Sequence, residues 1–307
     1  MDWTHRLRLR NLQMLLSLAQ TGNMSQSAQA LNTTQPGLSK WLKELEDDVG
    51  LPLFERLAKG LKPTVYGEAM IAHAQRIESH LNTAREDMSA MREGGRGMVA
   101  IGTSGASASD TMPLAVLKLL QAMPEARVRL VESTMDRLLE QLARGDLDII
   151  VGRTAPEHHD PAITTEVLYM EPIHFVARPR HPIFDKPDPD WADLSAYRWI
   201  LWPKGTPIRN ALETAMAGAG QGLPAGHLET NSTTLNLTLL NNSNMIGVAS
   251  HRAALRYSQI NAMRVVPLRL SGFGSVAMYW RADAMNRPAV DGARECLRQV
   301  VAEFIQA

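Results

Sequence analysis

The chain has 307 residues, of which 45% are hydrophobic, so it is long enough for two or three soluble domains with sizeable cores. Its single cysteine, Cys296, excludes an internal disulfide framework, and its 32 basic and 32 acidic residues cancel to a net charge of zero. No uninterrupted apolar stretch reaches the roughly 18 residues that cross a bilayer, and the N-terminal segment lacks a hydrophobic export signal, so we expect a cytoplasmic protein without a membrane partner.

The first predicted element is a helix over residues 4–20, with leucines at helical spacing and Thr21-Gly22 at its end. Charge is distributed unevenly here, because the first 66 residues carry eight Lys and Arg against six Asp and Glu. So small a positive excess predicts that one chain binds DNA weakly. A dimer doubles the phosphate contacts, which raises the affinity and steepens its salt dependence.

The spacing of apolar residues in 25–50 predicts two short helices joined by a polar turn. The first helix has an apolar edge at Ala28 and Leu31. The second has an apolar edge at Leu38, Trp41, Leu42, Leu45 and Val49. Because each apolar edge is short, we expect the two helices to bury these edges by packing against each other. Thr34 suits a helix N-cap and Pro36 suits a first helical turn, so the second helix is expected to begin near Thr34.

The outward face of this second helix is polar or cationic as far as Glu44. Gln can pair with the adenine edge, Lys with guanine acceptors or phosphates, and free N–H groups at a helix start favour a phosphate. The face therefore indicates a recognition helix, with an ordinary helical hairpin and a solvated face as the alternative. The expected DNA contacts from the two helices are Ser25, Thr34, Gln35, Pro36, Ser39, Lys40 and Lys43.

Residues 51–64 predict two short extended pieces around Lys59-Gly60. Apolar side chains in this segment, such as Leu53 and Leu61, would anchor it to the helices. Its cations would then point outward, as in a wing that touches phosphates or the minor groove. A plain basic loop is the alternative. The expected DNA contacts here are Arg56, Lys59 and Lys62.

Residues 64–92 predict one long helix. Its apolar residues recur at alternating steps of four and three: Met70, Ala74, Ile77, Leu81, Ala84, Met88 and Met91. A helix of this length spans roughly 40 Å, and an apolar seam along it would be costly to leave in water. We therefore predict a dimerisation and linker helix. The alternative is that the seam packs against a second domain of the same chain.

Residues 12–70 resemble the N-terminal winged helix-turn-helix of LysR-type transcriptional regulators. The matching features, in order, are Thr21-Gly22, Ser25, Gln35-Pro36 followed by Leu38-Ser39, Leu45-Glu46, Gly50, Leu53-Phe54-Glu55-Arg56, and Thr64 with Gly67. Ser27, Lys40 and Trp41 depart from the residues usual in that family, which affects the operator sequence. The resemblance implies a transcriptional regulator that binds promoter DNA as a homodimer or homotetramer, with RNA polymerase as a further candidate partner.

Three glycines in residues 93–97 cannot continue a helix and predict a hinge. Strands and helices then alternate, which predicts a parallel sheet covered by helices. The expected strands are 98–104, 126–133 and 147–153, strands within 167–182, then 197–202, 227–230, 245–250, 263–270 and 275–281. The expected helices are 113–123, 135–144, 208–217, 233–240 and 288–304. Two lobes joined by crossing strands resemble periplasmic-type binding proteins, to which the LysR-type effector domain is similar.

Small hydroxyl residues follow several of the predicted strands. In open α/β sheets, ligands lie beyond the carboxyl ends of the strands, where helix N-termini present free N–H groups. We therefore predict a cleft for a small anionic effector such as a carboxylate, sulfonate, phosphate or sugar acid, with Arg209 as a further cation. The expected effector contacts are Thr103, Ser104, Gly105, Ala106, Ser107, Thr134, Trp202, Lys204, Gly205, Thr206, Thr230 and Asn231.

The pattern Trp199-Ile200-Leu201, with Pro203 and Arg209 after it, resembles the galactose-binding-protein-regulator subgroup of the LysR family. No nucleophile elbow, P-loop or dinucleotide fingerprint is present, so we expect neither catalysis nor a cofactor. His158-His159-Asp160 lacks a further ligand at matching spacing, so we expect a solvated loop and no metal site. The alternatives are a solute-binding protein, or an enzyme with an appended DNA-binding domain.

The sequence thus predicts a multidomain chain: an all-α winged helix-turn-helix in residues 1–63, a linker coiled-coil helix in 64–93, and an α/β two-lobed effector domain in 94–307. Lobe I is expected at about 98–166 and 269–307, and lobe II at about 167–268. In the predicted mechanism, an effector bound between the lobes changes the geometry of the dimer and so the DNA contacts, which requires that it bind the two arrangements with different affinity.

Overall fold

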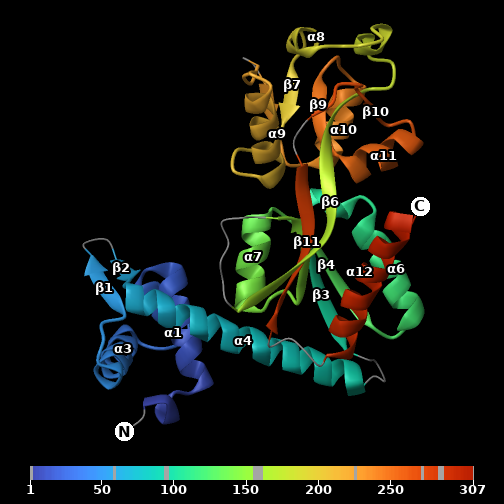
Figure 1. Cartoon of the computed structure of the whole chain (residues 1–307). Helices are drawn as coiled ribbons and strands as arrows, with labels where there is room; N and C mark the ends of the chain where they lie inside the picture. Colours follow the sequence, from blue (N-terminus) through green and yellow to red (C-terminus); the bar gives the residue numbers. More distant parts are fainter. Residues whose placement is uncertain are drawn as a thin grey trace. The chain divides into compact units, whose positions relative to one another are not determined.

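The computed structural model describes residues 3–57, 60–92, 97–154, 162–224, 227–270, 273–282 and 287–306. The chain divides into two compact units, Met1–Asp87 and Met88–Ala307, and the division falls inside the long helix α4 (Val65–Arg92) (Figure 1). The domain boundaries predicted after residues 63 and 93 remain predictions. Across the described ranges, no helix is both long and apolar enough to span a membrane.

The first unit is a helical domain with a two-stranded hairpin. Its elements before α4 are η1 (Trp3–Arg6), α1 (Leu9–Thr21), α2 (Met24–Ala30), α3 (Gln35–Val49), β1 (Phe54–Leu57) and β2 (Gly60–Pro63). The two apolar edges predicted for residues 25–50 do pack together, because Ala28, Leu38, Leu42 and Leu45 are buried in one core. Thr34 is the N-cap of α3, as predicted.

The first helix begins later than predicted, at Leu9 instead of residue 4. Arg8 has an extended backbone, and its N–H donates to the side-chain oxygen of Asn11 at 2.7 Å. This cap fixes the start of α1, so the residues before it form only the short helix η1. The predicted end is confirmed, because Gly22 follows Thr21 with a φ of 59°, in the left-handed region that glycine adopts easily.

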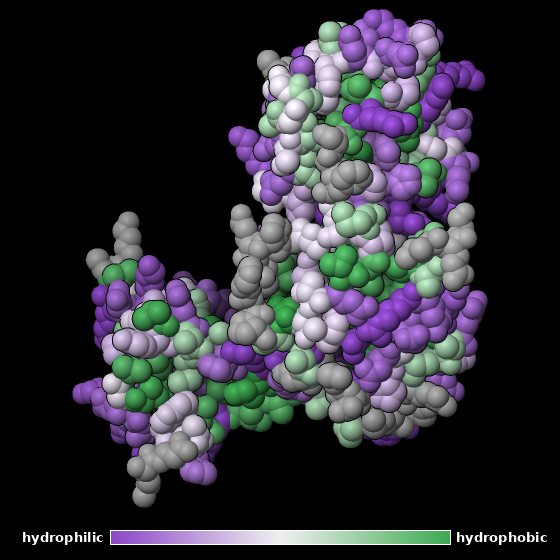
Figure 2. All heavy atoms as spheres, viewed as in Figure 1, coloured by the Kyte–Doolittle hydropathy of each residue, from purple (hydrophilic) through white to green (hydrophobic). Residues whose placement is uncertain are grey.

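The helix α4 is continuous, as predicted, but its apolar seam has two environments. Met70 and Ala74 pack into the core of the first unit. Further along, Ile77, Leu81 and Met88 are 40%, 45% and 60% exposed, and hydrophobic residues form part of the visible surface along α4 (Figure 2). The seam is therefore buried in the first unit at its start and exposed at these three described positions further along.

The second unit is built on one continuous sheet with the strand order β4-β3-β5-β11-β6-β9-β7-β8, and β10 pairs with β6. The strands are β3 (Met98–Thr103), β4 (Arg127–Glu132), β5 (Ile149–Arg153), β6 (Ile163–Ala177), β7 (Trp199–Leu201), β8 (His227–Glu229), β9 (Ile246–Ser250), β10 (Arg264–Val265) and β11 (Phe273–Arg281). The helices are α5 (Gly105–Ala108), α6 (Thr111–Ala122), α7 (Met135–Arg144), η2 (Pro182–Asp185), α8 (Trp191–Ser195), α9 (Pro207–Gly218), α10 (Thr233–Asn241), α11 (His251–Gln259) and α12 (Pro288–Gln306).

Two lobes share this sheet, as Figure 1 shows. In lobe I, α6 and α12 cover one face of β3, β5 and β11, and α7 covers the other. In lobe II, α9 packs on one side of β7 and β9, and α10 and α11 pack on the other. The predicted two-lobed α/β architecture is confirmed, but the sequence pattern did not predict α11, which follows β9 directly.

The connection between the lobes is simpler than predicted. One strand, β6, runs for 15 residues. Its first half pairs with β11 in lobe I, and its second half pairs with β9 and β10 in lobe II. Alternation of apolar and polar residues breaks near Pro172, which is why the pattern there suggested separate strands. The predicted hinge at residues 93–97 lies outside the described residues, apart from Gly97.

Candidate functional site

The start of α3 presents an exposed polar surface. The hydroxyl of Thr34 accepts a hydrogen bond from the backbone N–H of Gly37 at 3.2 Å, which caps the helix. Because Pro36 has no backbone N–H, Gln35 carries the remaining N–H of this first turn. Gln35, Pro36, Lys40 and Lys43 are exposed, and so is Ser25 at the start of α2. The surface therefore combines exposed polar side chains and exposed cations, which suits contact with a nucleic acid.

Two of the predicted DNA contacts bind each other. The guanidinium of Arg56, on β1, donates to the hydroxyl of Ser39, on α3, at 2.9 Å. This bond joins the hairpin to the helix and orients Arg56 along the same surface. Lys40 lies 3.8 Å from Glu44, but both side chains are more than half exposed, so this ion pair competes weakly with a phosphate.

The hairpin β1–β2 is held against the turn between α1 and α2. The backbone N–H of Leu61 donates to the carbonyl of Gly22 at 2.7 Å, and a Cβ on Gly60 would lie 2.3 Å from that same oxygen. Glycine is therefore required at this close approach. Lys62 is exposed on β2, and Lys59 lies outside the described residues.

The unusual Ser27 has a local partner. Its side chain is fully buried, and its hydroxyl lies 2.6 Å from that of Thr21. The serine is therefore accommodated in the core of the first unit and does not face DNA. Trp41 is partly buried against the same core, so neither departure adds a group to the exposed surface.

In the second unit, a cavity of about 1100 Å³ lies between the lobes. Eight of the predicted effector contacts line it: Ser104, Gly105, Thr134, Trp202, Lys204, Gly205, Thr206 and Asn231. Three longer helices begin at this cavity, α7 after Thr134, α9 after Thr206 and α10 after Ser232. Their N-termini place partial positive charge around it.

Other predicted contacts lie beneath the cavity. Thr103 and Ser107 are buried, with their hydroxyls 2.9 Å apart, and Ser107 donates to the carbonyl of Val151 at 2.7 Å. Thr230 accepts a hydrogen bond from the backbone N–H of Ser232 at 3.1 Å and is not among the lining residues. These three hydroxyls brace the loops that line the cavity. Ala106 belongs to α5, but its side chain is outside the described ones.

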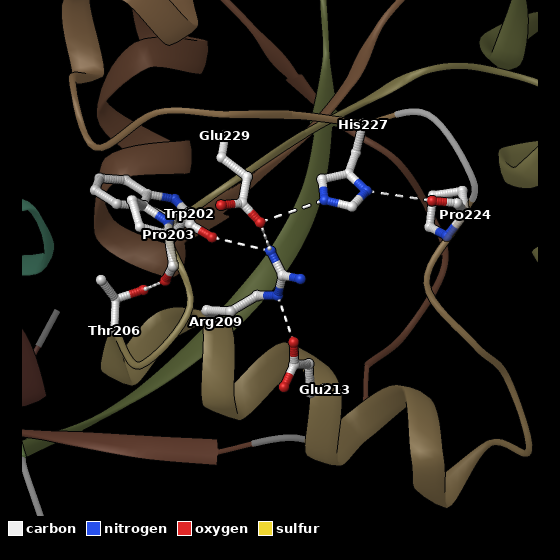
Figure 3. A network of polar contacts seen from close by, with 8 residues as sticks. All are labelled: Trp202, Pro203, Thr206, Arg209, Glu213, Pro224, His227 and Glu229. Atoms are coloured by element: carbon white, nitrogen blue, oxygen red, sulfur yellow. Dashed lines mark hydrogen bonds and ion pairs between the residues drawn. The ribbon is translucent and has the colours of Figure 1, made fainter.

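Arg209, expected as a cation of the cleft, is instead paired with carboxylates of its own lobe (Figure 3), although its Nη2 is buried without a hydrogen-bond partner among the described residues. Its side chain is buried, and it donates to Glu213 at 2.6 Å, to the carbonyl of Trp202 at 3.0 Å and to Glu229 at 3.2 Å. Two carboxylates and a carbonyl leave little positive charge to offer a ligand. Its role is to hold the loop after β7 against α9 and β8.

A further cation that lines the cavity is Arg153, which was not among the contacts predicted from the sequence. It ends β5, is 3% exposed and lines the cavity. One guanidinium nitrogen, Nη1, donates to the carbonyl of Glu171 at 2.8 Å, whereas Nε and Nη2 are buried without a hydrogen-bond partner among the described residues. A charged residue directly after the buried strand Ile-Ile-Val-Gly was the signal that could have identified it.

The surroundings of Arg153 shift two pKa values. Burial lowers the pKa of Arg153, and the nearby charge of Glu171 partly opposes this. Burial also raises the pKa of Glu171 to about 7, although the backbone N–H of Arg252 and the charge of Arg153 act in the other direction. At the mouth of the cavity, the hydroxyl of Thr134 donates to Asp136 and lowers the pKa of that carboxyl, so the start of α7 is already partly neutralised.

The two lobes also approach each other closely at Gly105. A Cβ on Gly105 would lie 3.1 Å from the indole of Trp202, whose N–H donates to the carbonyl of Val248 at 3.0 Å. Because residue 105 is a glycine, the indole of Trp202 in lobe II can pack directly against lobe I beside the cavity. His158, His159 and Asp160 lie outside the described residues, and in the described ranges no three His, Cys, Asp or Glu side chains are grouped as metal ligands would be.

A helical unit with an exposed cationic helix start, followed by two lobes around a cavity, defines a DNA-binding regulator with a ligand-binding domain. Comparison with known families agrees. Residues 9–68 match the bacterial regulatory helix-turn-helix protein, lysR family, and residues 92–302 match the LysR substrate binding domain. The second match covers more than half of the chain. The chain belongs to the LysR family of DNA-binding transcriptional regulators.

Among curated relatives, the chain is 31% identical over 295 residues to the HTH-type transcriptional regulator GbpR of Azospirillum brasilense, covering 95% of this chain and 85% of that one. It is 30% identical over 296 residues to GalR of Pseudomonas putida, covering 96% and 74%. Among solved structures, full-length CbnR complexed with its target DNA has a TM-score of 0.68 at 21% identity, covering 96% and 100%. The predicted family and fold are thereby confirmed.

Proposed function

We propose that this regulator responds to a small organic anion bound in the cavity between its lobes, with Arg153 as the residue that recognises the negative charge. The observation that carries the proposal is a buried guanidinium that lines the cavity and has two donors, Nε and Nη2, without a partner among the described residues. An unpaired buried charge is costly, and a bidentate carboxylate or sulfonate would offset that cost.

The rest of the lining supports a polar ligand of modest size. Hydroxyl and amide side chains surround the site, and Trp202 supplies one aromatic wall. The described lining carries three basic residues, Arg137, Arg153 and Lys204, against two acidic ones, Glu132 and Asp136. A ligand with one negative charge and several hydrogen-bonding groups, such as a hydroxylated carboxylic acid or a sugar acid, fits these contacts.

In the proposed regulator, α3 lies in the major groove and the hairpin touches the backbone. The contacts are those predicted from the sequence, and Ser39 acts partly through Arg56. The exposed part of the α4 seam pairs with α4 of a second copy, because Ile77, Leu81 and Met88 are otherwise left in water. The similarity to relatives named as transcriptional regulators supports a role without catalysis, inside the cell where promoter DNA lies.

The effector proposal is tested by thermal unfolding of the full chain with small carboxylates, sulfonates and sugar acids, each paired with its neutral amide or alcohol analogue. A true effector raises the melting temperature by binding the native state, and its neutral analogue does not. Arg153→Met should abolish this shift, whereas Arg137→Met, which removes an exposed cation from the same lining, should reduce it only slightly. Equal shifts with neutral analogues, or an unchanged shift in Arg153→Met, would show that the anion contact is misassigned.

The DNA contacts are tested by binding to a promoter fragment over a range of salt concentrations. Gln35→Ala and Lys40→Ala should each cost on the order of 1–3 kcal/mol if they contact bases. If Lys40 instead contacts a phosphate, its variant should lose affinity for all sequences and lower the salt slope by about one. Gln13→Ala, an exposed change on α1, is the matched control. Wild-type affinity in both test variants would contradict the assignment of the recognition helix.

A further inference from the structure

The two lobes are joined in a way that permits them to rotate. Among the described strands, β6 is the one that pairs in both lobes. Its register against β11 shifts between Val276 and Ala277, so that an extra residue, Leu168, bulges from the ladder. A bulge near a crossing point lets a strand bend and twist at low cost. Some other contact must therefore fix the angle between the lobes.

One side chain of lobe II makes that contact. Arg252 lies in the first turn of α11, and its Nε donates to the carboxylate of Asp110, in lobe I, at 2.8 Å. Its guanidinium carbon also lies 3.2 Å from the centre of the Phe304 ring, on α12 of lobe I. The Arg252 and Asp110 side chains are 20% and 16% exposed, so this ion pair is shielded from water far more than a surface pair is.

The lobe I side of this contact is rigidly built. Asp110 is the N-cap of α6 and accepts hydrogen bonds from the backbone and hydroxyl of Thr111. That hydroxyl lies 2.9 Å from the phenol oxygen of Tyr169, whose ring centre is 5.7 Å from the Arg252 guanidinium. The guanidinium thus meets an anion whose position is already fixed and two aromatic rings, and little further ordering is needed to form the contact.

The same turn of α11 also lines the effector cavity. Ser250, just before the helix, and Ala253 line the cavity, whereas Arg252 between them contacts lobe I. The backbone N–H of Arg252 further donates to the buried carboxyl of Glu171 at 2.9 Å, and Glu171 lies on the crossing strand β6. A rotation of the lobes that moves this turn therefore changes the cavity wall and the Arg252 contacts together.

We propose that Arg252 is an interlobe latch: its contacts with Asp110 and Phe304 hold the lobes at the angle of this structure, and their loss lets the lobes rotate about β6. The latch is a positioning element and contacts no ligand. It operates in the absence of effector and DNA, so it stands or falls independently of the proposed function. Its strength sets how much of a ligand's binding energy is needed to reach a second lobe arrangement.

The test measures the distance between the lobes in the full chain without effector. Spin labels are placed at Gln121→Cys in lobe I and Asn242→Cys in lobe II, both exposed, in a Cys296→Ala background. Labelled chains are mixed with an excess of unlabelled chains, so that only distances within one chain are recorded. In the otherwise unchanged chain, we expect one narrow distance distribution.

Arg252→Ala should broaden that distribution and shift its mean, and Phe304→Leu should do so to a smaller degree. Hydrogen exchange at the N–H groups of β9 and of the first turn of α11 should accelerate about tenfold or more, since one charge-assisted hydrogen bond is lost. Arg252→Lys, which keeps the charge, should restore part of the narrow distribution. Arg256→Ala, which removes an exposed arginine one turn further along the same helix, is the control and should change nothing.

A purely structural role gives a different result. If Arg252→Ala lowers the melting temperature but leaves both the mean and the width of the distance distribution unchanged, the latch proposal is wrong. Asp110→Asn provides a second route to the same answer, because it removes the charge but keeps a side chain that can cap α6. An unchanged distribution in both Asp110→Asn and Arg252→Ala would overturn the proposal even if one variant alone folded poorly.

Discussion

Two buried arginines, one in each lobe, show how differently the same residue can be used. In lobe II, Arg209 is surrounded by Glu213, Glu229 and the carbonyl of Trp202. In lobe I, Arg153 lines the cavity and has one carbonyl partner, and its Nε and Nη2 are buried without a partner among the described residues. The first arrangement holds a loop in place. The second leaves buried donors beside a cavity, which is the arrangement that we propose for an anion site.

The largest expected effect comes from replacing Arg209, the arginine that is paired with carboxylates in lobe II. Arg209→Met should destabilise the fold by about 4 kcal/mol, because it leaves the Trp202 carbonyl without its donor and removes the buried cation shared by Glu213 and Glu229. The midpoint of urea unfolding of the full chain measures this loss. Arg256→Met, an exposed substitution, is the control. A loss below about 1 kcal/mol would mean that the network in lobe II is not what holds the loop.

The next largest effect concerns the carboxyl of Glu171, whose charge acts on Arg153. The pKa of Glu171 is raised to about 7 from an ordinary value of 4.5, so the folded state binds the proton more tightly than the unfolded state does. Folding stability due to this group is therefore full below about pH 4.5, declines as the pH rises towards 7, and is absent above it. Over this range the loss is at most about 3 kcal/mol.

Glu171→Gln should remove that loss, because glutamine stays neutral and still accepts the hydrogen bond from Arg252. Urea unfolding at pH 5 and pH 8 measures the difference. We expect the variant to be more stable than the wild-type chain at pH 8 and similar to it at pH 5. If the free energies of unfolding of the two proteins changed with pH in the same way, ionisation of Glu171 would not lower the stability of the fold.

Arg153→Met should change stability by no more than about 1 kcal/mol, because the loss of one hydrogen bond is offset by removal of a poorly paired buried charge. This prediction contrasts directly with the one for Arg209 and uses the same urea measurement. A loss as large as that of Arg209→Met would assign both arginines to structural roles.

The smallest effect is expected beneath the cavity. Thr103→Val keeps the shape of the side chain but removes the hydroxyl that bonds Ser107, which keeps its bond to Val151. We expect a loss of about 1 kcal/mol in stability and an unchanged response to any anion that binds the cavity. Thermal unfolding with and without that anion measures both quantities. A lost response with intact stability would instead place Thr103 in contact with the ligand.

The exposed polar surface at the start of α3 was predictable because its groups lie close together in the sequence. Thr34, Gln35 and Lys40 share one helix, so their common exposure follows from the helical period alone. The cavity could be located at the strand ends, but its charges could not be assigned. The i,i+4 partner of Arg209, Glu213, is visible in the sequence, whereas Glu229 is brought there only by the pairing of β8 with β7.

Arg252 illustrates the limit further. It lies 142 positions from Asp110 along the chain, on a helix that the sequence pattern did not reveal. The helix is short and follows β9 without a loop, and its N-cap Ser250 is also the last residue of the strand, so no separate turn marks its start. Contacts that depend on two lobes coming together are specified by tertiary packing, and neither residue carries a local sign of the other.

The long strand β6 also has a thermodynamic consequence. Its lobe I ladder ends at Pro172, which pairs with β11, and its lobe II ladder begins at the next residue, Ile173, which pairs with β9, so melting of one lobe frays the adjoining end of the other lobe's ladder. Residues 97–306 should therefore lose their structure in one cooperative transition, with equal calorimetric and van't Hoff enthalpies for that step. Calorimetric scans would then show one unfolding peak for the two lobes together.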